Sequence, residues 1–406
     1  MKIGILGAGA AGFFGAIQAA QANPNAEVIL LEKSTKLLAK VLISGGGRCN
    51  VTHHCLDNAR LVQHYPRGAK ELRSAFERFS VNDTIAWFAT QGVTLKTEAD
   101  GRMFPDTNKS ETIIQALTEA AKLAKVKIYT NLQQIKVHYL APGFNVQDKD
   151  GNSFIFDKIL IATGGAPQIE NFKWLQALGH DIIPPVPSLF TFNLKQHPLA
   201  HLSGISVEKA EVKILGTKLI QQGPLLITHW GLSGPVILRL SAWGARTLHD
   251  LNYLFDVSIN WLPEFKEESL RAYLEKFKTE NNKKLIGTQS PFREIPSRLW
   301  KWMYEQAGIT DQLKWADISK KQNNILIEIL LRNTLKVDGK STFKEEFVTA
   351  GGISLKDVDF KTMESKKCKG MYFAGEVLDI DAITGGFNFQ AAWTTSYIAG
   401  NSMGTI

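Results

Sequence analysis

The residues of this chain most able to form a ligand site are glycines, and the first set lies near the N-terminus. Gly7, Gly9 and Gly12 follow a short apolar stretch and precede a helical one, the spacing of a turn that binds the pyrophosphate of a dinucleotide. Gly7 allows the tight turn, Gly9 leaves space between backbone and phosphates, and Gly12 lets the helix pack closely. The positive end of the helix, at Ala10 and Ala11, would face the phosphates.

An acidic residue completes this unit. Residues 28–31 form a second apolar strand ending on Glu32, at the spacing where a carboxylate accepts hydrogen bonds from the hydroxyls of an adenosine ribose. Lys33 follows directly and is assigned to the same site. We therefore predict a β-α-β unit that binds a dinucleotide. The alternative is a glycine-rich turn without a ligand.

A second glycine set, Ser44-Gly45-Gly46-Gly47, is followed by Arg48, Cys49 and Asn50. Backbone this bare usually lies against a ligand. We predict a loop that crosses the central or redox-active part of the same cofactor, with Arg48 or Lys40 near phosphate or ring oxygens. A flexible surface hinge is the alternative.

Five motifs spread over nearly the whole chain resemble the bacterial predicted-flavoprotein family that includes BaiN-type enzymes. They are GAGAAG at 7–12, SGGGRCNVT at 44–52, GRMFP at 101–105, THWGLSGP at 228–235 and GMYFAGEVLD at 370–379. The resemblance implies FAD, bound in the manner of the glutathione-reductase superfamily, and a domain inserted in mid-chain. His53, His54 and Cys55 stand where a polar continuation is expected, so no role carries over to them.

Three later segments are also assigned to the flavin. A buried strand ends in a glycine turn that would meet FAD a second time, and a third buried strand leads to acids that would bond the ribityl hydroxyls. A last glycine turn opens a helix whose N–H groups and dipole would stabilise negative charge at the N1/O2 side of a reduced flavin; without the first motif, it would be interpreted as a capped packing helix. The residues are Thr163, Gly164, Gly165, Gly375, Glu376, Asp379, Thr384, Gly385, Gly386 and Asn388.

Three residues are candidates for catalysis or for supplying a proton: Cys49, Arg102 and His229. Each has an alternative. Cys49 and Cys55 could form a redox pair, but their separation differs from that of flavin disulfide reductases. Arg102 beside apolar residues also suits an ordinary turn, and a histidine in a glycine-containing turn is often structural.

No metal site is expected. Cys49, His53, His54 and Cys55 lie in one crowded segment, which rarely supplies four convergent ligands, and the sequence has no second cluster. The chain has three cysteines and no CxxC pair, which agrees with a reducing compartment.

We expect an α/β fold, namely a Rossmann-like three-layer FAD-binding domain interrupted by an inserted β plus helical domain. The stiff segment at 184–187 marks the exit. The FAD-binding domain is placed at 1–190 and 343–406. The insert is placed at 191–342, strand-rich over 191–262 and helical over 263–335. Because no second GxGxxG unit exists, a nicotinamide would bind transiently in the same cleft.

Composition indicates a globular protein: 44% of the 406 residues are hydrophobic and 21% are charged. No apolar run reaches the length of about 18 residues that a membrane span needs, and no signal peptide is recognisable, so we expect a cytoplasmic protein with no membrane partner. The net charge is +8, and residues 263–340 hold 15 Lys and Arg against 11 Asp and Glu. Basic residues among aromatics there could meet RNA, although a solvated helix face with the aromatics inward is the favoured interpretation.

The expected activity is that of an FAD-dependent oxidoreductase, which takes hydride from NAD(P)H and reduces a conjugated carbon–carbon double bond through flavin N5. The resemblance implies either a steroid-like small molecule or a uridine in ribosomal RNA, and the basic insert favours structured RNA. Two other hypotheses remain: a small-molecule, amine-type flavin oxidase, and a non-catalytic FAD-containing RNA-binding factor.

Overall fold

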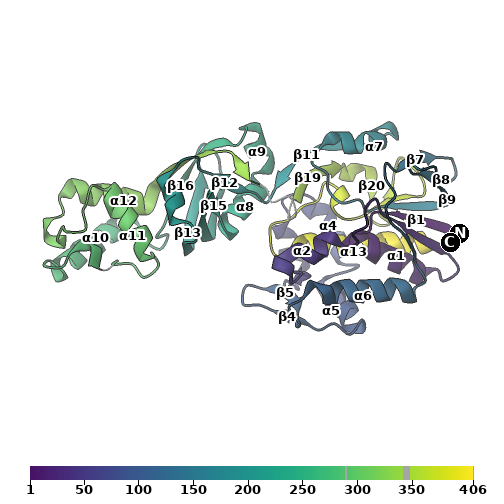
Figure 1. Cartoon of the computed structure of the whole chain (residues 1–406), viewed down its shortest axis with the longest axis horizontal. Coiled ribbons are helices and arrows are strands. Elements are labelled where there is room, and N and C mark those ends of the chain that lie inside the picture. The colour runs from purple at the N-terminus through teal and green to yellow at the C-terminus, as the bar shows by residue number, and fades with distance from the viewer. Residues whose placement is uncertain (289, 342–347, 406) are drawn as a thin grey trace. The chain divides into compact units, whose positions relative to one another are not determined.

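The computed structural model of the chain describes residues 1–288, 290–341 and 348–405, which fold into two compact units (Figure 1). The first unit joins Met1–Ser188 with Lys344–Ile406, and the second is Leu189–Phe343. The first unit is therefore discontinuous in sequence, and each unit has its own core.

The first unit is built on a seven-stranded sheet whose centre is parallel. Its strand order is β20-β21-β22-β10-β1-β2-β6, and the last five strands run parallel to one another. Their apolar side chains are almost continuous because helices cover both faces of such a sheet. The strands are β1 (Lys2–Leu6), β2 (Glu27–Leu31), β6 (Lys127–Tyr129), β10 (Lys158–Ile161), β20 (Val358–Asp359), β21 (Glu364–Ser365) and β22 (Met371–Phe373).

Two helices from opposite ends of the chain, α1 (Ala10–Ala22) and α13 (Phe387–Gly404), pack tightly against each other. Glycines make this possible, since a Cβ at Gly400 would lie 2.6 Å from the carbonyl oxygen of Gly15. Six more described helices belong to this unit: α2 (Ala39–Gly47), α3 (Asn58–Leu61), α4 (Ala69–Phe76), α5 (Val81–Thr90), α6 (Ser110–Leu123) and the short α7 (Lys173–Ala177). Among the described helices none is long and apolar enough to cross a membrane.

Three small antiparallel sheets complete the first unit. One of them, β3-β5-β4, lies next to the start of α13. Another contains the proline-rich segment, which forms a strand of a two-stranded sheet and so meets the rule that proline avoids central strands. The strands are β3 (Thr52–His53), β4 (Leu95–Thr97), β5 (Arg102–Pro105), β7 (Lys136–Tyr139), β8 (Phe144–Gln147), β9 (Ser153–Phe156), β11 (Ile182–Ser188) and β19 (Val348–Ile353).

The second unit contains a seven-stranded antiparallel sheet with the order β17-β16-β13-β14-β15-β12-β18. Two helices, α8 (Pro235–Trp243) and α9 (Ala245–Asp250), fall within the stretch that the sequence pattern describes as strand-rich. The strands are β12 (Thr191–Asn193), β13 (Ser206–Ile214), β14 (Ile220–Thr228), β15 (Gly231–Ser233), β16 (Leu254–Asn260), β17 (Asn333–Asp338) and β18 (Lys340–Ser341).

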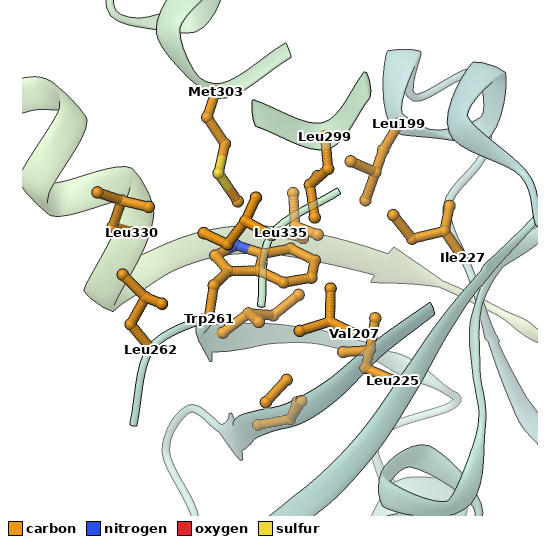
Figure 2. Packing of buried hydrophobic residues seen from close by; sticks show 14 of the residues in the cluster. Leu199, Val207, Leu225, Ile227, Trp261, Leu262, Leu299, Met303, Leu330 and Leu335 are labelled. Carbon is orange, nitrogen blue, oxygen red and sulfur yellow. The ribbon is translucent and has the colours of Figure 1, made fainter. Parts of the chain in front are cut away.

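Trp261 lies at the centre of the second unit's core (Figure 2). Its fully buried indole is surrounded by side chains from the sheet, such as Val207, and from the helices, such as Met303. The helices are α10 (Glu267–Glu280), α11 (Ser297–Gln306) and α12 (Lys320–Arg332). Sheet and helices therefore share one hydrophobic core. The whole architecture confirms the predicted α/β class with a Rossmann-like parallel sheet.

Candidate functional site

The first glycine turn has the geometry that its sequence predicts. Gly7 has φ +103°, and a Cβ there would lie 2.5 Å from the carbonyl oxygen of Ala162. A Cβ at Gly12 would lie only 1.7 Å from the carbonyl oxygen of Gly7. At Gly9, the N-cap of α1, a Cβ would meet nothing within 4 Å. The protein itself therefore needs glycine at 7 and 12, whereas Gly9 borders open space at a helix N-terminus, where an anion is stabilised.

Glu32 lies at the end of β2, beside this turn. Its carboxylate accepts hydrogen bonds from the backbone N–H of Ala8 (2.8 Å) and from the N–H and hydroxyl of Ser34 (2.9 and 3.0 Å). These bonds fix its orientation, and a carboxylate has further lone pairs with which to accept bonds from ribose hydroxyls. Lys33 follows it and is exposed. The position of Glu32 fits the predicted ribose contact.

The second glycine set is not a simple loop. It forms the end of α2, which is broken by non-helical backbone at Ser44, Gly45 and Gly46. Gly45 packs against Phe104, since a Cβ there would lie 2.9 Å from its ring. At Gly46 and Gly47 a Cβ would meet nothing within 4 Å. The N–H of Leu38 donates to the carbonyl of Ala8 (2.9 Å), so the start of α2 lies next to the first turn.

Two arginines assigned to the site are held by acids of the β3-β5-β4 sheet region. Arg48 forms an ion pair with Glu98 (2.6 Å), and its guanidinium lies 4.0 Å from the centre of the Phe104 ring. Arg102 pairs with the same Glu98 (3.1 Å) and with Asp100 (2.7 Å). These acids balance both cations, so the geometry favours structural roles for them over direct contact with phosphate or substrate.

Cys49 is fully buried and has a left-handed backbone with φ +59°. Burial raises the pKa of its thiol to about 12, so the group stays protonated at neutral pH. Cys49, Cys55 and Cys368 are all free thiols. A thiol this weakly acidic is a poor proton donor and a poor redox partner, which speaks against the catalytic role predicted for Cys49.

The third glycine turn, at Thr163, Gly164 and Gly165, faces a polar group of side chains. A Cβ at Gly164 would meet nothing within 4 Å, while one at Gly165 would lie 2.6 Å from both the Glu376 carboxylate and the Thr349 hydroxyl. The carboxylate of Glu376 accepts bonds from Lys40 Nζ (2.6 Å) and from the backbone N–H of Thr349 (2.9 Å). Lys40 and Glu376, assigned separately, therefore form one ion pair here.

The hydroxyl of Thr349 is buried and has no hydrogen-bond partner among the described residues. Such an orphan is costly unless something else bonds it. Together with the open space at Gly9, Gly46, Gly47 and Gly164, it fits an extended, polar cofactor such as FAD. Gly375 and Asp379 flank Glu376; a Cβ at Gly375 would lie 2.9 Å from Ala11 of α1, and the N–H of Asp379 donates to Ile353 (3.0 Å).

The fourth turn, Thr384-Gly385-Gly386, begins α13. Gly385 and Gly386 have φ +132° and +92°, values that glycine adopts without strain. The first turn of α13 contains no acidic side chain, so its N–H groups keep the full positive end of the helix dipole. The amide of Asn388 instead bonds the N–H and carbonyl of Ala382 (2.9 and 3.3 Å), which holds the preceding loop.

His229 lies in the second unit. Thr228 pairs with Gly231, so His229 and Trp230 form the two-residue turn between β14 and β15. Both are exposed, Trp230 by 66%. The structure thus brings the cofactor candidates of the first unit together, while His229 stands on a separate hairpin.

Two residues lie next to the fourth turn, Asn50 and His53. The sequence pattern assigns neither of them a role at the site. His53 Nδ1 lies 3.0 Å from the carbonyl oxygen of Gly385, 332 residues away in the chain. A local pattern cannot reveal such a contact. The only sequence signal was that His53 follows a glycine-rich motif at a position where its residue type is unexpected.

Comparison with known proteins gives one family and several relatives. Residues 1–402 match the family described as HI0933-like protein Rossmann domain. A 3-dehydro-bile acid delta(4,6)-reductase of Clostridium scindens is 29% identical over 99% of this chain and 98% of its own length. A ribosomal RNA dihydrouridine synthase of Haemophilus influenzae is 30% identical over 97% of this chain and 96% of its own length.

Among solved structures, the 3-ketosteroid delta1-dehydrogenase of Sterolibacterium denitrificans superposes with a TM-score of 0.52, covering 99% of both chains at 10% identity. This likeness concerns the fold.

Proposed function

Since this chain belongs to the HI0933-like protein Rossmann-domain family and is an FAD-dependent oxidoreductase, we propose that it reduces a conjugated carbon–carbon double bond with NAD(P)H as the reductant. The observation that carries the proposal is a set of glycine turns in one unit, three of which border open space at Gly9, Gly46, Gly47 and Gly164, together with the buried hydroxyl of Thr349, which has no hydrogen-bond partner among the described residues. The names of two relatives support the reaction type, because both describe reduction of a carbon–carbon double bond.

The proposed cofactor contacts come from all four turns. The N-terminus of α1 would hold the pyrophosphate, Glu32 the ribose, and the Thr349 and Glu376 group the polar middle of the cofactor. The start of α13 would lie against the pyrimidine side of the ring, where its N–H groups stabilise negative charge. When bound, FAD supplies the hydride chemistry.

Reduction of a double bond adds one hydride and one proton, so the protein must also deliver a proton to carbon. Cys49 is buried with a raised pKa, and Arg102 is held by two acids. His229 is exposed, and histidine is the residue that most often transfers protons near neutral pH. His229 lies on the β14–β15 hairpin of the second unit and stays the candidate donor that the sequence names.

We propose a uracil in ribosomal RNA as the substrate. Support comes from the name of the Haemophilus influenzae relative and from five exposed lysines in the second unit. Backbone bonds bring their segments together: Lys284 accepts from Trp315 (3.0 Å), and Asn282 accepts from Ala316 (3.2 Å). Among the described residues none of these five forms an ion pair; the lysine cluster is Lys283, Lys284, Lys314, Lys320 and Lys321. Such a cluster suits a phosphate backbone.

Two other lysines in the helical part of the second unit, on α10 and α11, are already ion-paired. Lys276 pairs with Glu280 (3.8 Å), and Lys301 pairs with Asp311 (2.6 Å). Trp300 and Tyr304, which alternate with basic residues in the sequence, are buried and therefore lie inward. Any attraction for RNA here is therefore electrostatic, without stacking by these two rings.

The decisive experiment reduces the FAD-loaded protein with NADPH or NADH without oxygen, then adds protein-free rRNA that lacks dihydrouridine. Reoxidation of the flavin together with formation of dihydrouridine is expected. A parallel sample receives a conjugated steroid ketone. If rRNA leaves the flavin reduced and the ketone oxidises it, the substrate is a small molecule. If neither does so, and an amine added to the oxidised protein reduces the flavin and drives oxygen consumption, the protein is an oxidase.

The RNA proposal is tested separately by changing charge. Lys283→Glu with Lys284→Glu should weaken rRNA binding and lower the slope of log K against log salt by about 0.7 to 0.9 per lost phosphate contact. Lys276→Gln serves as the control. Because Lys276 is already paired with Glu280, this substitution should leave the slope unchanged. Equal slopes in all three proteins would remove the lysine cluster from the interface.

A further inference from the structure

The peptide that joins Gly385 to Gly386 is held at both of its polar ends by side chains of residues 50–53. Its carbonyl oxygen, on Gly385, lies 3.0 Å from His53 Nδ1. Its N–H, on Gly386, lies 3.0 Å from the side-chain oxygen of Asn50, in the amide orientation that satisfies all neighbours of Asn50. Because a carbonyl can only accept, Nδ1 must carry the hydrogen.

We propose that Asn50 and His53 are positioning residues which clamp this peptide and thereby fix the N-terminal end of α13. The inference rests on the proposed function, in which the end of α13 faces the flavin. It assigns a role to two side chains that act through the backbone at the start of α13 and need not touch the substrate.

A clamp is needed because two successive glycines begin the helix. Glycine has more backbone freedom than any other residue, so an unheld Gly385-Gly386 pair would not keep one orientation. A Cβ at Gly386 would lie 2.5 Å from the carbonyl oxygen of Thr52, so only glycine allows segment 50–53 to come this close. The glycines permit the contact, and the two side chains then remove the freedom that the glycines introduce.

The residues around the clamp are themselves held in place. The amide of Asn50 also donates to the carbonyls of Thr52 (2.9 Å) and Met103 (3.2 Å). The ring of His53 stacks on Phe387, the first residue of α13, with 4.5 Å between ring centres. The hydroxyl of Thr52 donates to Gln390 (2.6 Å), one turn further along the helix. Segment 50–53 therefore reaches α13 through several bonds, of which the clamp is the one at the helix end.

The clamp also links two of the four glycine turns. Asn50 directly follows the motif that contains Gly45, Gly46 and Gly47, and its partner Gly386 begins the last turn. Helix N–H groups in the first turn of α13 have no partner within the helix. Fixing the Gly385–Gly386 peptide fixes where these donors point, so a shift of one glycine turn would move the other.

Titration should leave the clamp intact, because imidazole with hydrogen on Nδ1 and imidazolium both donate to Gly385. The charged and titratable groups near His53 are Asp100 and Arg102 from the adjacent sheet and His64, whose ring centre lies 6.1 Å from that of His53. The first turn of α13 adds no acid.

The test uses substitutions that separate the donor from the ring. His53→Asn keeps an N–H group at the position of Nδ1, while His53→Leu fills similar space without a donor. In the FAD-free protein, the amides of Gly386, which donates to Asn50, and of Gln390, which donates to the Gly386 carbonyl, should exchange hydrogen up to about tenfold faster in His53→Leu and at the wild-type rate in His53→Asn. His54→Ala, at the exposed neighbouring position, is the control.

A second measurement follows the cofactor. FAD should bind up to about tenfold more weakly to His53→Leu, and the reduction potential of bound FAD should fall, with both restored in His53→Asn. Asn50→Ala should have a similar effect, and the double variant should add little to either single change because both side chains hold one peptide.

Several outcomes would contradict the proposed clamp. Unchanged exchange and an unchanged potential in His53→Leu would do so, as would equal loss in His53→Leu and His53→Asn. If His53→Leu does not fold, His53→Gln replaces it, since its amide lies near Nε2 and cannot reach Gly385. Failure of the proposed function looks different: the wild-type protein would reduce neither substrate, while the exchange comparison between variants would still give its result.

Discussion

At the scale of residues, burial decides what the cysteines can do. The pKa of Cys49 is raised to about 12 by burial, and burial also raises the pKa values of Cys55 and Cys368. Only Cys55 is partly accessible. In a flavin protein the thiol in the glycine-rich motif is easily taken for a redox group, and the structure argues against that for this chain.

Alkylation with iodoacetamide tests this directly. At pH 8 only about one Cys49 thiol in ten thousand would be ionised, so the folded protein should be labelled at Cys55 long before Cys49 or Cys368. Mass spectrometry of peptides gives the order, and the unfolded protein, in which all three react, is the control. Cys49→Ala should change substrate-driven reoxidation by less than about twofold. Rapid labelling of folded Cys49 would contradict this account.

The position of a residue can be predicted from the sequence where a local pattern determines it. It cannot be predicted where a partner far away in the chain determines it. Gly7, Gly9, Gly12 and Glu32 lie where their spacing places them. The pairing of Lys40 with Glu376 is absent from any local pattern, because the partners come from distant parts of the chain. Burial of Cys49 was equally hidden, since it depends on how the glycine-rich segment packs.

At the scale of elements, the first turn and α1 separate two reasons for glycine. Gly12 is required by the protein, because a Cβ would lie 1.7 Å from a backbone oxygen, whereas Gly9 has an extended backbone and open space beside it. The same motif therefore contains one position for folding and one for a ligand.

Gly12→Ala and Gly9→Ala should consequently fail in different ways. Gly12→Ala should destabilise the FAD-free protein by about 3 kcal/mol or more, because backbone must move to admit the new methyl group. Gly9→Ala should leave that stability within about 0.5 kcal/mol and weaken FAD binding at least tenfold, since the methyl occupies the space proposed for the phosphates. Urea unfolding and FAD titration measure the two effects. Normal FAD affinity in Gly9→Ala would exclude the pyrophosphate from this turn.

Periodicity identified most elements but missed breaks within them. The helical pattern of the second unit gave α10, α11 and α12, whereas α8 and α9 lie inside a strand-rich stretch. A loop is expected at residues 44–50, but Gly45, Gly46 and Gly47 form the end of α2. The apolar residues that precede them already form the helix. Local propensity does not determine such boundaries when tertiary packing competes with it.

At the scale of the whole molecule, each unit has its own hydrophobic core, and Trp261 is central to one of them. Trp261→Ala should destabilise the second unit by about 3 to 5 kcal/mol through the cavity it leaves. Trp261→Phe should cost less, since the buried indole N–H has no partner among the described residues. Hydrogen exchange read separately in each unit is the measurement. Equal loss of protection in β1 and β10 of the first unit would show that the two cores unfold together.

The discontinuity of the first unit has a consequence for synthesis on the ribosome. The sheet strands β1, β2 and β10 are made early, but β22, the Glu376 turn and α13 follow only after the whole of Leu189–Phe343. Chains grow from the N-terminus, and domains fold as units when their residues are available. The apolar face of α1 must therefore wait for α13, while the second unit can fold first. FAD capture would be one of the last events in the life of the nascent chain, which makes this helix pair the step where a chaperone would be needed most.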